Sequence, residues 1–61
     1  MFEIFWDDFY TGEKRNEKRH GNTNFEELDN EIYSRWKNFH QGTEFQIFDD
    51  GKLVRKYPKV R

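Results

Sequence analysis

The clearest pattern along the chain is a stripe of apolar residues in the segment 24–41. These residues recur at spacings of three and four, which places them on one face of an α-helix. They are Phe25, Leu28, Ile32, Trp36 and Phe39. Either Asn24, or Thr23 in a capping box with Glu26, would begin the helix. Gly42 would end it, because glycine readily takes the left-handed conformation that follows a helix.

Residues 2–10 predict a β-strand, because aromatic residues dominate this segment. Alternate residues of a strand share a face. One face holds Phe2, Ile4, Trp6 and Tyr10, interrupted by Asp8. The other face holds Glu3, Phe5, Asp7 and Phe9. We expect the first face to join the core, which leaves Phe5 and Phe9 in need of a cover or a partner.

Residues 43–57 predict a β-hairpin with its turn at residues 49–51, since this Asp-Asp-Gly sequence is strong turn chemistry. We favour a three-residue loop with a bulge, which pairs Ile47 with Leu53. A two-residue turn is the alternative and would pair Ile47 with Val54. In the favoured register, the face that joins the core carries Phe45, Ile47, Leu53 and Tyr57, and the opposite face carries Phe48 and Val54.

The segment 11–24 is polar throughout and contains a cluster of basic residues. These residues are Lys14, Arg15, Lys18 and Arg19. We expect an exposed loop here, and a short second strand within it is an alternative. An ordered loop of this length inside a compact domain is often functional. A plain solvated connector would show the same composition.

The predicted order of elements is strand, long loop, helix, strand and strand, within a single domain that spans residues 1–61. This β-α-β-β order is typical of an α+β fold. We expect a three-stranded, mostly antiparallel sheet with one helix packed on one face. Pro58 would end the last strand, which leaves residues 58–61 as a basic tail.

The composition changes this picture, because twelve of the 61 residues are aromatic and only seven are Ile, Leu or Val. Rings must build most of the core, since each buries roughly 150–250 Å². One helix covers only one face of a sheet, so the apolar residues on the other face are a surplus. They are Phe5, Phe9, Phe48 and Val54. Tyr33 lies off the helical stripe and is a further exposed ring.

The charge and the residue types exclude several classes of protein. The formal net charge is −1, whereas a protein that coats duplex DNA needs a strong basic excess. The absence of cysteine excludes disulfides and thiolate metal sites. No stretch approaches the ~20 apolar residues that a membrane span needs, and no secretory signal is visible. We therefore expect a cytoplasmic protein with no membrane contact.

Residues that carry most enzyme chemistry are scarce or isolated in this chain. Ser34 lies inside the predicted helix without the glycines of a nucleophile elbow. His20 and His40 show no metal-ligand spacing. Asp7 and Asp8 are neighbours on a strand, so their carboxylates point to opposite faces. We therefore expect a non-catalytic chain that holds neither a metal ion nor a cofactor.

The predicted function is binding to another protein through an aromatic sheet face with a charged rim. The residues assigned to this site are Phe5, Phe9, Phe48, Val54, Tyr33, Lys14, Arg15, Lys18 and Arg19. Aromatic and arginine side chains are typical anchors of protein interfaces. A small chain of this kind suits an inhibitor, an antagonist or an adaptor of a larger protein, and a phage-encoded antagonist is one such setting. A homodimer is another way of covering the same rings.

Single-stranded nucleic-acid binding is the alternative function. Aromatic rings on an exposed sheet stack bases at ~1–3 kcal/mol each, and the basic residues of the segment 11–24 would hold phosphates. Acidic residues that share the predicted face count against it, as does the lack of an RNP-type sequence. They are Glu3, Asp7 and Glu44.

Overall fold

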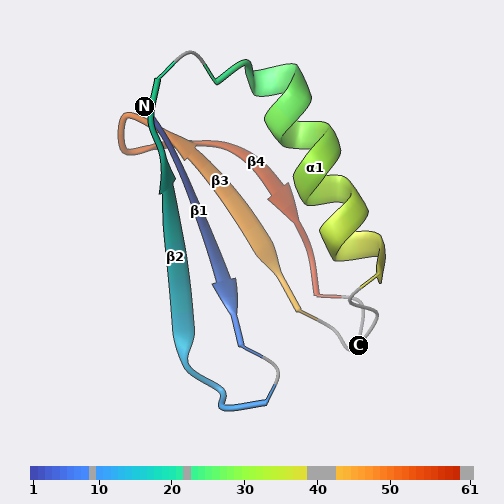
Figure 1. Ribbon diagram of the computed structural model, residues 1–61. Coiled ribbons are helices and arrows are strands. Elements are labelled where there is room, and N and C mark those ends of the chain that lie inside the picture. The colour runs from blue at the N-terminus through green and yellow to red at the C-terminus, as the bar shows by residue number, and fades with distance from the viewer. Residues whose placement is uncertain (9, 22, 39–42, 60–61) are drawn as a thin grey trace.

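The computed structural model describes residues 1–8, 10–21, 23–38 and 43–59 (Figure 1). One helix packs on an open antiparallel sheet of four strands, in the order β2-β1-β3-β4. The elements are β1 Phe2–Asp7, β2 Lys14–Arg19, α1 Phe25–Asn38, β3 Phe45–Asp49 and β4 Lys52–Tyr57. The predicted α+β class is confirmed. The expectation of three strands is wrong, because β2 forms within the segment that we expected to be a loop.

β1 ends at Asp7, earlier than expected, because the side chain of Asp8 begins a turn. One oxygen of this carboxylate accepts hydrogen bonds from the backbone N–H groups of Tyr10 and Thr11, at 2.8 and 3.1 Å. Aspartate favours turns through such local bonds. The bonds from Thr11 and Tyr10 also lower the pKa of Asp8. Tyr10 therefore lies beyond the strand and is 90% exposed, so its assignment to the core is wrong.

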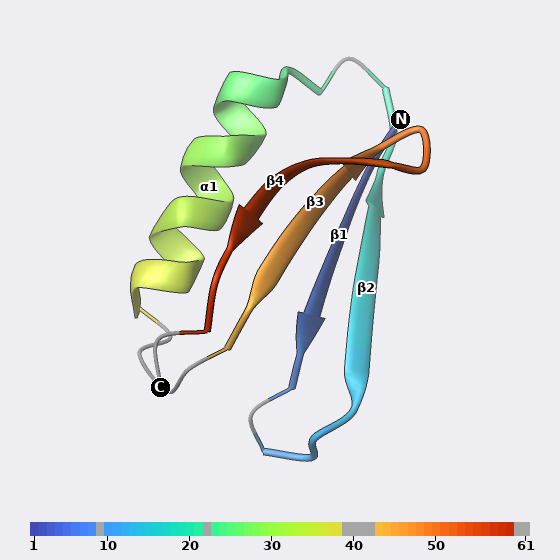
Figure 2. The ribbon, with the colours of Figure 1, turned by 180° about the vertical axis from the view of Figure 1, so that it is seen from behind.

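β2 forms although none of its six residues is apolar. It pairs with β1 along its whole length, and Lys14 lies opposite Asp7. The Nζ atom of Lys14 is 3.3 Å from the Asp7 carboxylate, and Asn16 donates a 2.6 Å hydrogen bond to Glu3. Such cross-strand pairs stabilise the strand in place of buried side chains. β2 lies at the sheet edge farthest from the helix, which runs beside β3 and β4 (Figures 1 and 2).

The helix begins at Asn24, which is its N-cap residue. The side-chain oxygen of Asn24 accepts a 2.7 Å hydrogen bond from the backbone N–H of Glu26, as an N-cap residue does. The hydroxyl of Thr23 instead donates to the carbonyl of His20, at 3.4 Å, so the capping box does not form. The described helix ends at Asn38. Phe39, His40 and the predicted stop at Gly42 lie outside the described residues.

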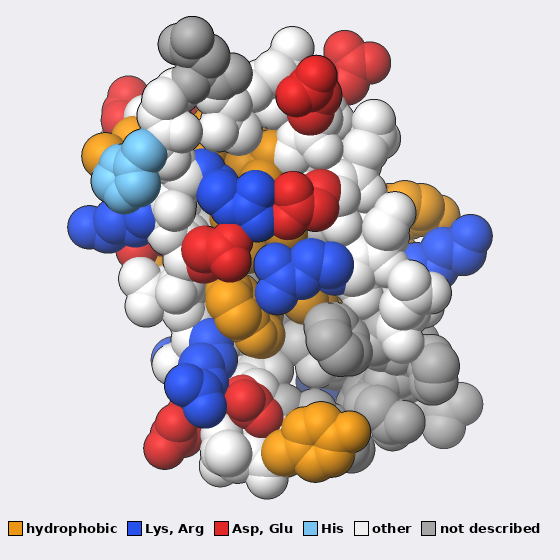
Figure 3. Space-filling view, viewed as in Figure 1, with side chains coloured by type: hydrophobic (Ala, Val, Ile, Leu, Met, Phe, Trp, Pro, Cys, Tyr) orange, Lys and Arg blue, Asp and Glu red, His pale blue; other side chains and the backbone are white. Residues whose placement is uncertain are grey.

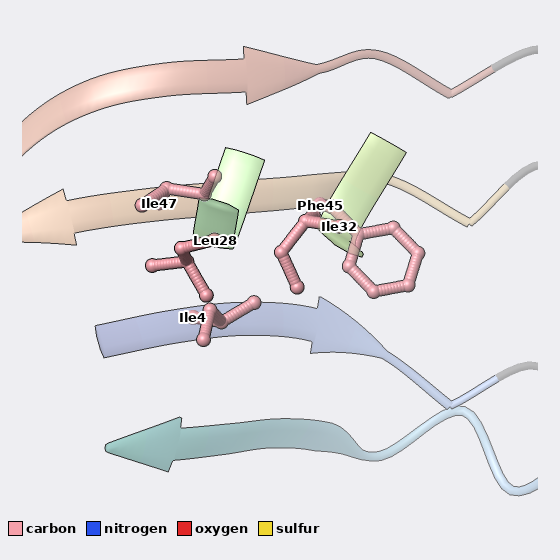
Figure 4. Packing of buried hydrophobic residues seen from close by; sticks show 5 residues of the cluster. All are labelled: Ile4, Leu28, Ile32, Phe45 and Ile47. Atoms are coloured by element: carbon pink, nitrogen blue, oxygen red, sulfur yellow. The ribbon is translucent and has the colours of Figure 1, made fainter. Parts of the chain in front are cut away.

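The core lies between the helix and the two central strands (Figure 4). Its fully buried side chains come from β1, α1 and β3, and are Ile4, Leu28, Ile32, Phe45 and Ile47. Partly buried residues pack around them, namely Phe2, Trp6, Phe25, Trp36 and Tyr57. The rings of Trp6 and Phe45 stack with centroids 6.0 Å apart. Every described residue of the predicted core except Leu53 and Tyr10 therefore joins it.

The turn between β3 and β4 has two residues, not the three that we favoured. Asp49 pairs with Lys52, and the residues between them, Asp50 and Gly51, have φ angles of 50° and 83°. Positive φ at both central positions defines a type I′ turn, which matches the twist of the flanking strands.

A bulge follows this turn and resets the register of the hairpin. Phe48 pairs with Leu53, but the next residue of β3, Ile47, pairs with Arg55. Val54 is therefore the extra residue of the bulge, and Ile47 pairs with neither Leu53 nor Val54. Because paired residues share a face, Leu53 lies beside Phe48 and away from the core. Its side chain is 46% exposed, so its assignment to the core is wrong.

Replacing Gly51 with alanine is expected to destabilise the fold by about 1–2 kcal/mol, since a Cβ makes the left-handed region costly. Nothing lies within 4 Å of a Cβ built at Gly51, so the cost comes from the backbone alone. Urea unfolding of the wild type and Gly51→Ala measures it. Gly51→Asn is the matched control, because asparagine tolerates this region better. Equal losses for both variants would contradict the backbone explanation.

Charged side chains add further contacts between the helix and the sheet around the apolar core. Arg19 of β2 binds both carboxylate oxygens of Glu31 on the helix and lies 2.6 Å from the carboxylate of Glu17. The hydrogen bonds from Arg19 lower the pKa of Glu31. The guanidinium of Arg35 lies 4.8 Å from the centre of the Trp6 ring, a cation–π contact. Figure 3 shows acidic and basic side chains interleaved over hydrophobic ones in the middle of this view.

Tyr57 joins β4 to the helix through a polar contact. Its hydroxyl donates a 2.6 Å hydrogen bond to Asp29, and the Nε atom of Arg55 is 3.5 Å from the same carboxylate oxygen. Burial, together with the bond to Asp29, raises the pKa of Tyr57 from 10.0 to about 12. The folded state therefore favours the neutral phenol. This stabilisation is complete below pH 10 and is lost as the pH rises from 10 to about 12.

Tyr57→Phe is expected to lower the free energy of unfolding by about 1–2 kcal/mol at pH 7, since a hydrogen bond to a charged group is lost. As the pH rises from 10 to about 12, the variant should also lose less stability than the wild type, because it has no phenol at position 57 to ionise. Urea unfolding of both proteins at pH 7 and pH 11 measures the two effects. The same fall in stability between these pH values in both proteins would contradict the role of Tyr57.

Candidate functional site

The sheet face opposite the helix, called the open face below, carries an apolar centre. Phe5 on β1 and Phe48 on β3 pack edge to face, with ring centroids 5.3 Å apart and planes at 81°. This is a favoured geometry for two aromatic rings. Leu53, which pairs with Phe48, extends the apolar centre onto β4. Both rings are only partly buried, so part of this apolar area remains accessible.

A groove of about 300 Å³ lies beside the two rings. Its lining residues come from three strands and from the residue that precedes β3, and are Phe5, Trp6, Asp7, Lys14, Glu44, Gln46 and Phe48. The rings supply an apolar surface, and the polar side chains surround it. A concave site of this kind, apolar with a few polar groups, is typical of binding sites.

Charges of both signs surround the groove and are held by neighbouring strands. Lys14 of β2 forms its 3.3 Å ion pair with Asp7 of β1. Glu44, which precedes β3, accepts a 2.7 Å hydrogen bond from Gln46 and lies 3.7 Å from the Nζ atom of Lys56 on β4. The two ion pairs lie at the surface, so each adds only a few tenths of a kcal/mol, up to ~1 kcal/mol, to stability. They nevertheless determine where the charged groups lie around the rings of Phe5 and Phe48.

The structure brings some of the predicted site residues together. Phe5 and Phe48 share the open face with Lys14 and Lys18. Val54 is the residue of the bulge and is 41% exposed. Phe9 lies outside the described residues.

The other predicted site residues lie on the helix side of the sheet. Arg15 and Arg19 alternate with Lys14 and Lys18 along β2, so their side chains take the opposite face. Arg19 accordingly binds the helix through Glu31. Tyr33 is 45% exposed on the helix, where its ring lies 5.9 Å from Trp36 and 5.8 Å from Tyr57. The structure therefore separates Tyr33 from Phe5 and Phe48.

Leu53 is the residue of the open face that sequence reasoning missed. The signal for it lay in the sequence Asp50-Gly51, which is one of the strongest predictors of a two-residue type I′ turn. Such a turn pairs Phe48 with Leu53 directly, as the structure has it. The bulge at Val54 shifts the register again, so that Tyr57 pairs with Phe45 and its side chain points toward the helix. No local sequence pattern predicts this bulge.

The described residues contain no group of three or more His, Asp or Glu side chains that could hold a metal ion. Among them, no helix has the length and apolar character that a membrane crossing requires. Comparisons with protein-family models, curated protein sequences and solved structures find no significant match to this chain.

Proposed function

We propose that this chain is a small, non-catalytic protein-binding module whose binding surface is the open face. The observation that carries the proposal is the Phe5–Phe48 ring pair beside the 46% exposed Leu53, on the face that the helix leaves uncovered. Contiguous apolar surface of this kind marks interaction sites. Aromatic residues at the centre of a patch, with a polar rim, match the anatomy of protein interfaces.

The charges of the open face favour a protein partner over single-stranded nucleic acid. Nucleic-acid grooves are lined by basic residues that follow the phosphate backbone. Among the described residues that line the groove beside Phe5 and Phe48, Asp7 and Glu44 are acidic and Lys14 alone is basic. Lys14 itself is paired with Asp7. A surface with both signs of charge around an apolar centre suits the mixed polar rim of a protein partner.

The form of this function that best suits the chain is inhibition or antagonism of a larger protein. The open face belongs to a sheet whose four strands are joined by antiparallel pairing, with one bulge in β4. A preformed surface loses little entropy when it binds, which favours affinity in a small chain. Such a chain acts by covering a site on its partner rather than by chemistry of its own.

Affinity capture followed by titration tests the proposal. The bait is the wild-type chain, and the test variant is Leu53→Ser, which removes apolar area from the open face at a half-exposed position. Tyr33→Ser is the matched control, because it removes a half-exposed apolar group on the helix side. We expect Leu53→Ser to weaken binding of the captured protein by about tenfold or more, as loss of a hot-spot residue does. Tyr33→Ser should bind like the wild type.

Three results would overturn the proposal. Full affinity of Leu53→Ser, with loss in Tyr33→Ser, would move the site to the helix side. Tight binding of a single-stranded oligonucleotide that disappears at high salt would favour the alternative function. Sedimentation of the free chain as a dimer, and of Leu53→Ser as a monomer, would make a second copy the occupant of the open face.

A further inference from the structure

The outer edge of β2 is a regular strand edge, and no strand of the described residues lies beside it. β2 is one end of the sheet and pairs with β1 at all six positions without a bulge. The other end, β4, carries the bulge at Val54 and is followed by Pro58, two devices that protect an edge from pairing. β2 has neither device, and its protection lies in its charged side chains instead. These charges leave the outward backbone N–H and C=O groups able to pair with a strand of opposite charge.

The charge of β2 is distributed unequally over the two faces of the sheet. On the helix side, Arg15 is paired with Asp8 and Arg19 with Glu31, so their charge is largely balanced. On the open face, Lys14 is 87% exposed and has one surface ion pair, to Asp7. Lys18 lies opposite Glu3 of β1 but forms no ion pair within the described part of the chain. The available positive charge of this edge therefore lies on the open face.

This charge pattern disfavours a second copy of the chain at the β2 edge. Antiparallel pairing of two β2 strands that centres on Asn16 keeps the two open faces on one side and places Lys14 of each copy against Lys18 of the other. Like charges in directly opposed positions destabilise a strand pair. The same lysines attract a strand of opposite charge, so they select the partner as well as preventing self-association.

We infer that the β2 edge binds an extended acidic segment of the partner protein, which joins the sheet as a fifth strand. The inference rests on the proposed function, since the added strand would belong to the protein that covers the open face. Its carboxylates would face Lys14 and Lys18, which are about 13 Å apart along the strand. The segment therefore carries acidic residues at alternate positions on its open-face side. Strand addition gains affinity from backbone hydrogen bonds and specificity from alternate side chains.

A titration with defined peptides tests this inference by nuclear magnetic resonance. The probe is a nine-residue peptide in which glutamate alternates with threonine, and its control places the same glutamates in one block. A third peptide replaces glutamate with lysine. We expect the alternating acidic peptide, at millimolar concentration, to slow amide hydrogen exchange at every second residue of β2. Its affinity should exceed that of the other two peptides by about fivefold or more.

Charge variants of the chain complete the test. The double variant Lys14→Gln and Lys18→Gln should weaken binding of the alternating peptide by about fivefold. Lys37→Gln, at an exposed position on the helix, should leave the affinity unchanged. Absence of slowed exchange in β2, or equal binding of the lysine peptide, would overturn the inference.

The inference and the proposed function fail in different ways. If β2 is not protected but Leu53→Ser still weakens binding of the captured protein, the partner uses the open face without adding a strand. If β2 is protected while Leu53→Ser and the wild type bind the captured protein equally, the edge binds acidic strands and the proposed role of the open face is wrong.

Discussion

Phe45→Ala is expected to leave the chain largely unfolded at 25 °C. Phe45 is fully buried, stacks on Trp6 and lies beneath the guanidinium of Arg35, at 5.4 Å. Truncating such a ring costs about 3–5 kcal/mol, because the apolar area is lost and a cavity remains. The whole fold of a 61-residue chain is stable by roughly 3–9 kcal/mol. Circular dichroism and tryptophan fluorescence during urea unfolding measure the change.

Phe48→Ala is the matched control, because Phe48 lies on the same strand but on the other face of the sheet. Its ring is only partly buried and contacts Phe5 on the open face. We expect a loss of about 1–2 kcal/mol, in line with partial burial of one apolar side chain. Equal losses for Phe45→Ala and Phe48→Ala would contradict the two-faced sheet.

Trp36→Ala is the second large effect, with an expected loss of about 2–4 kcal/mol. Trp36 joins the helix to β4 and to the residue after it. Its ring stacks on Tyr57 with centroids 5.2 Å apart, and its Nε1 atom donates a 2.9 Å hydrogen bond to the carbonyl of Pro58. The side chain is only partly buried, so the loss should be smaller than for Phe45. Urea unfolding followed by the fluorescence of Trp6 measures it.

Trp36→Phe separates the two contributions of this residue. Phenylalanine keeps most of the stacking on Tyr57 and loses the hydrogen bond to Pro58, so we expect a loss of about 1 kcal/mol. A Trp36→Ala variant as stable as the wild type would contradict the described packing of α1 against β4.

The helix and the core were predictable because their signal is both long and periodic. The stripe from Phe25 to Trp36 repeats over several turns, and only a helix places those residues on one face. Ile4 lies two residues from Phe2 and Trp6, and Ile47 lies two residues from Phe45, so alternate residues of each strand point to the same core. Burial against one helix requires apolar residues at this period of two in β1 and β3, so the sequence carries it.

β2 could be predicted only as an alternative to a loop, because its place in the sheet requires no apolar side chains. The helix lies over β3 and β4, and the helix-side surface of β2 is covered by the bridge from Arg19 to Glu31. Its pairing with β1 depends on backbone hydrogen bonds and on pairs such as Lys14 with Asp7. These are contacts between distant residues, and a local pattern does not contain them.

The apolar centre of the candidate site was predictable in part. Alternation along the two strands placed Phe5 and Phe48 on one face, and the structure brings their rings into contact. The groove depends on the register between β1 and β3 and on the position of β2, so its lining could not be read from the sequence. Leu53 was wrongly assigned to the core because the favoured turn had three residues, whereas the turn in the structure has two.

The most direct test of the central claim, that the open face meets the partner, is a chemical-shift map of the ¹⁵N-labelled chain bound to the captured protein. The largest changes are expected at Phe5, Phe48 and Leu53 and along β2. Residues on the exposed side of the helix, such as Tyr33, should keep their free-state shifts. Changes confined to the helix, with Phe5 and Phe48 unaffected, would contradict the account.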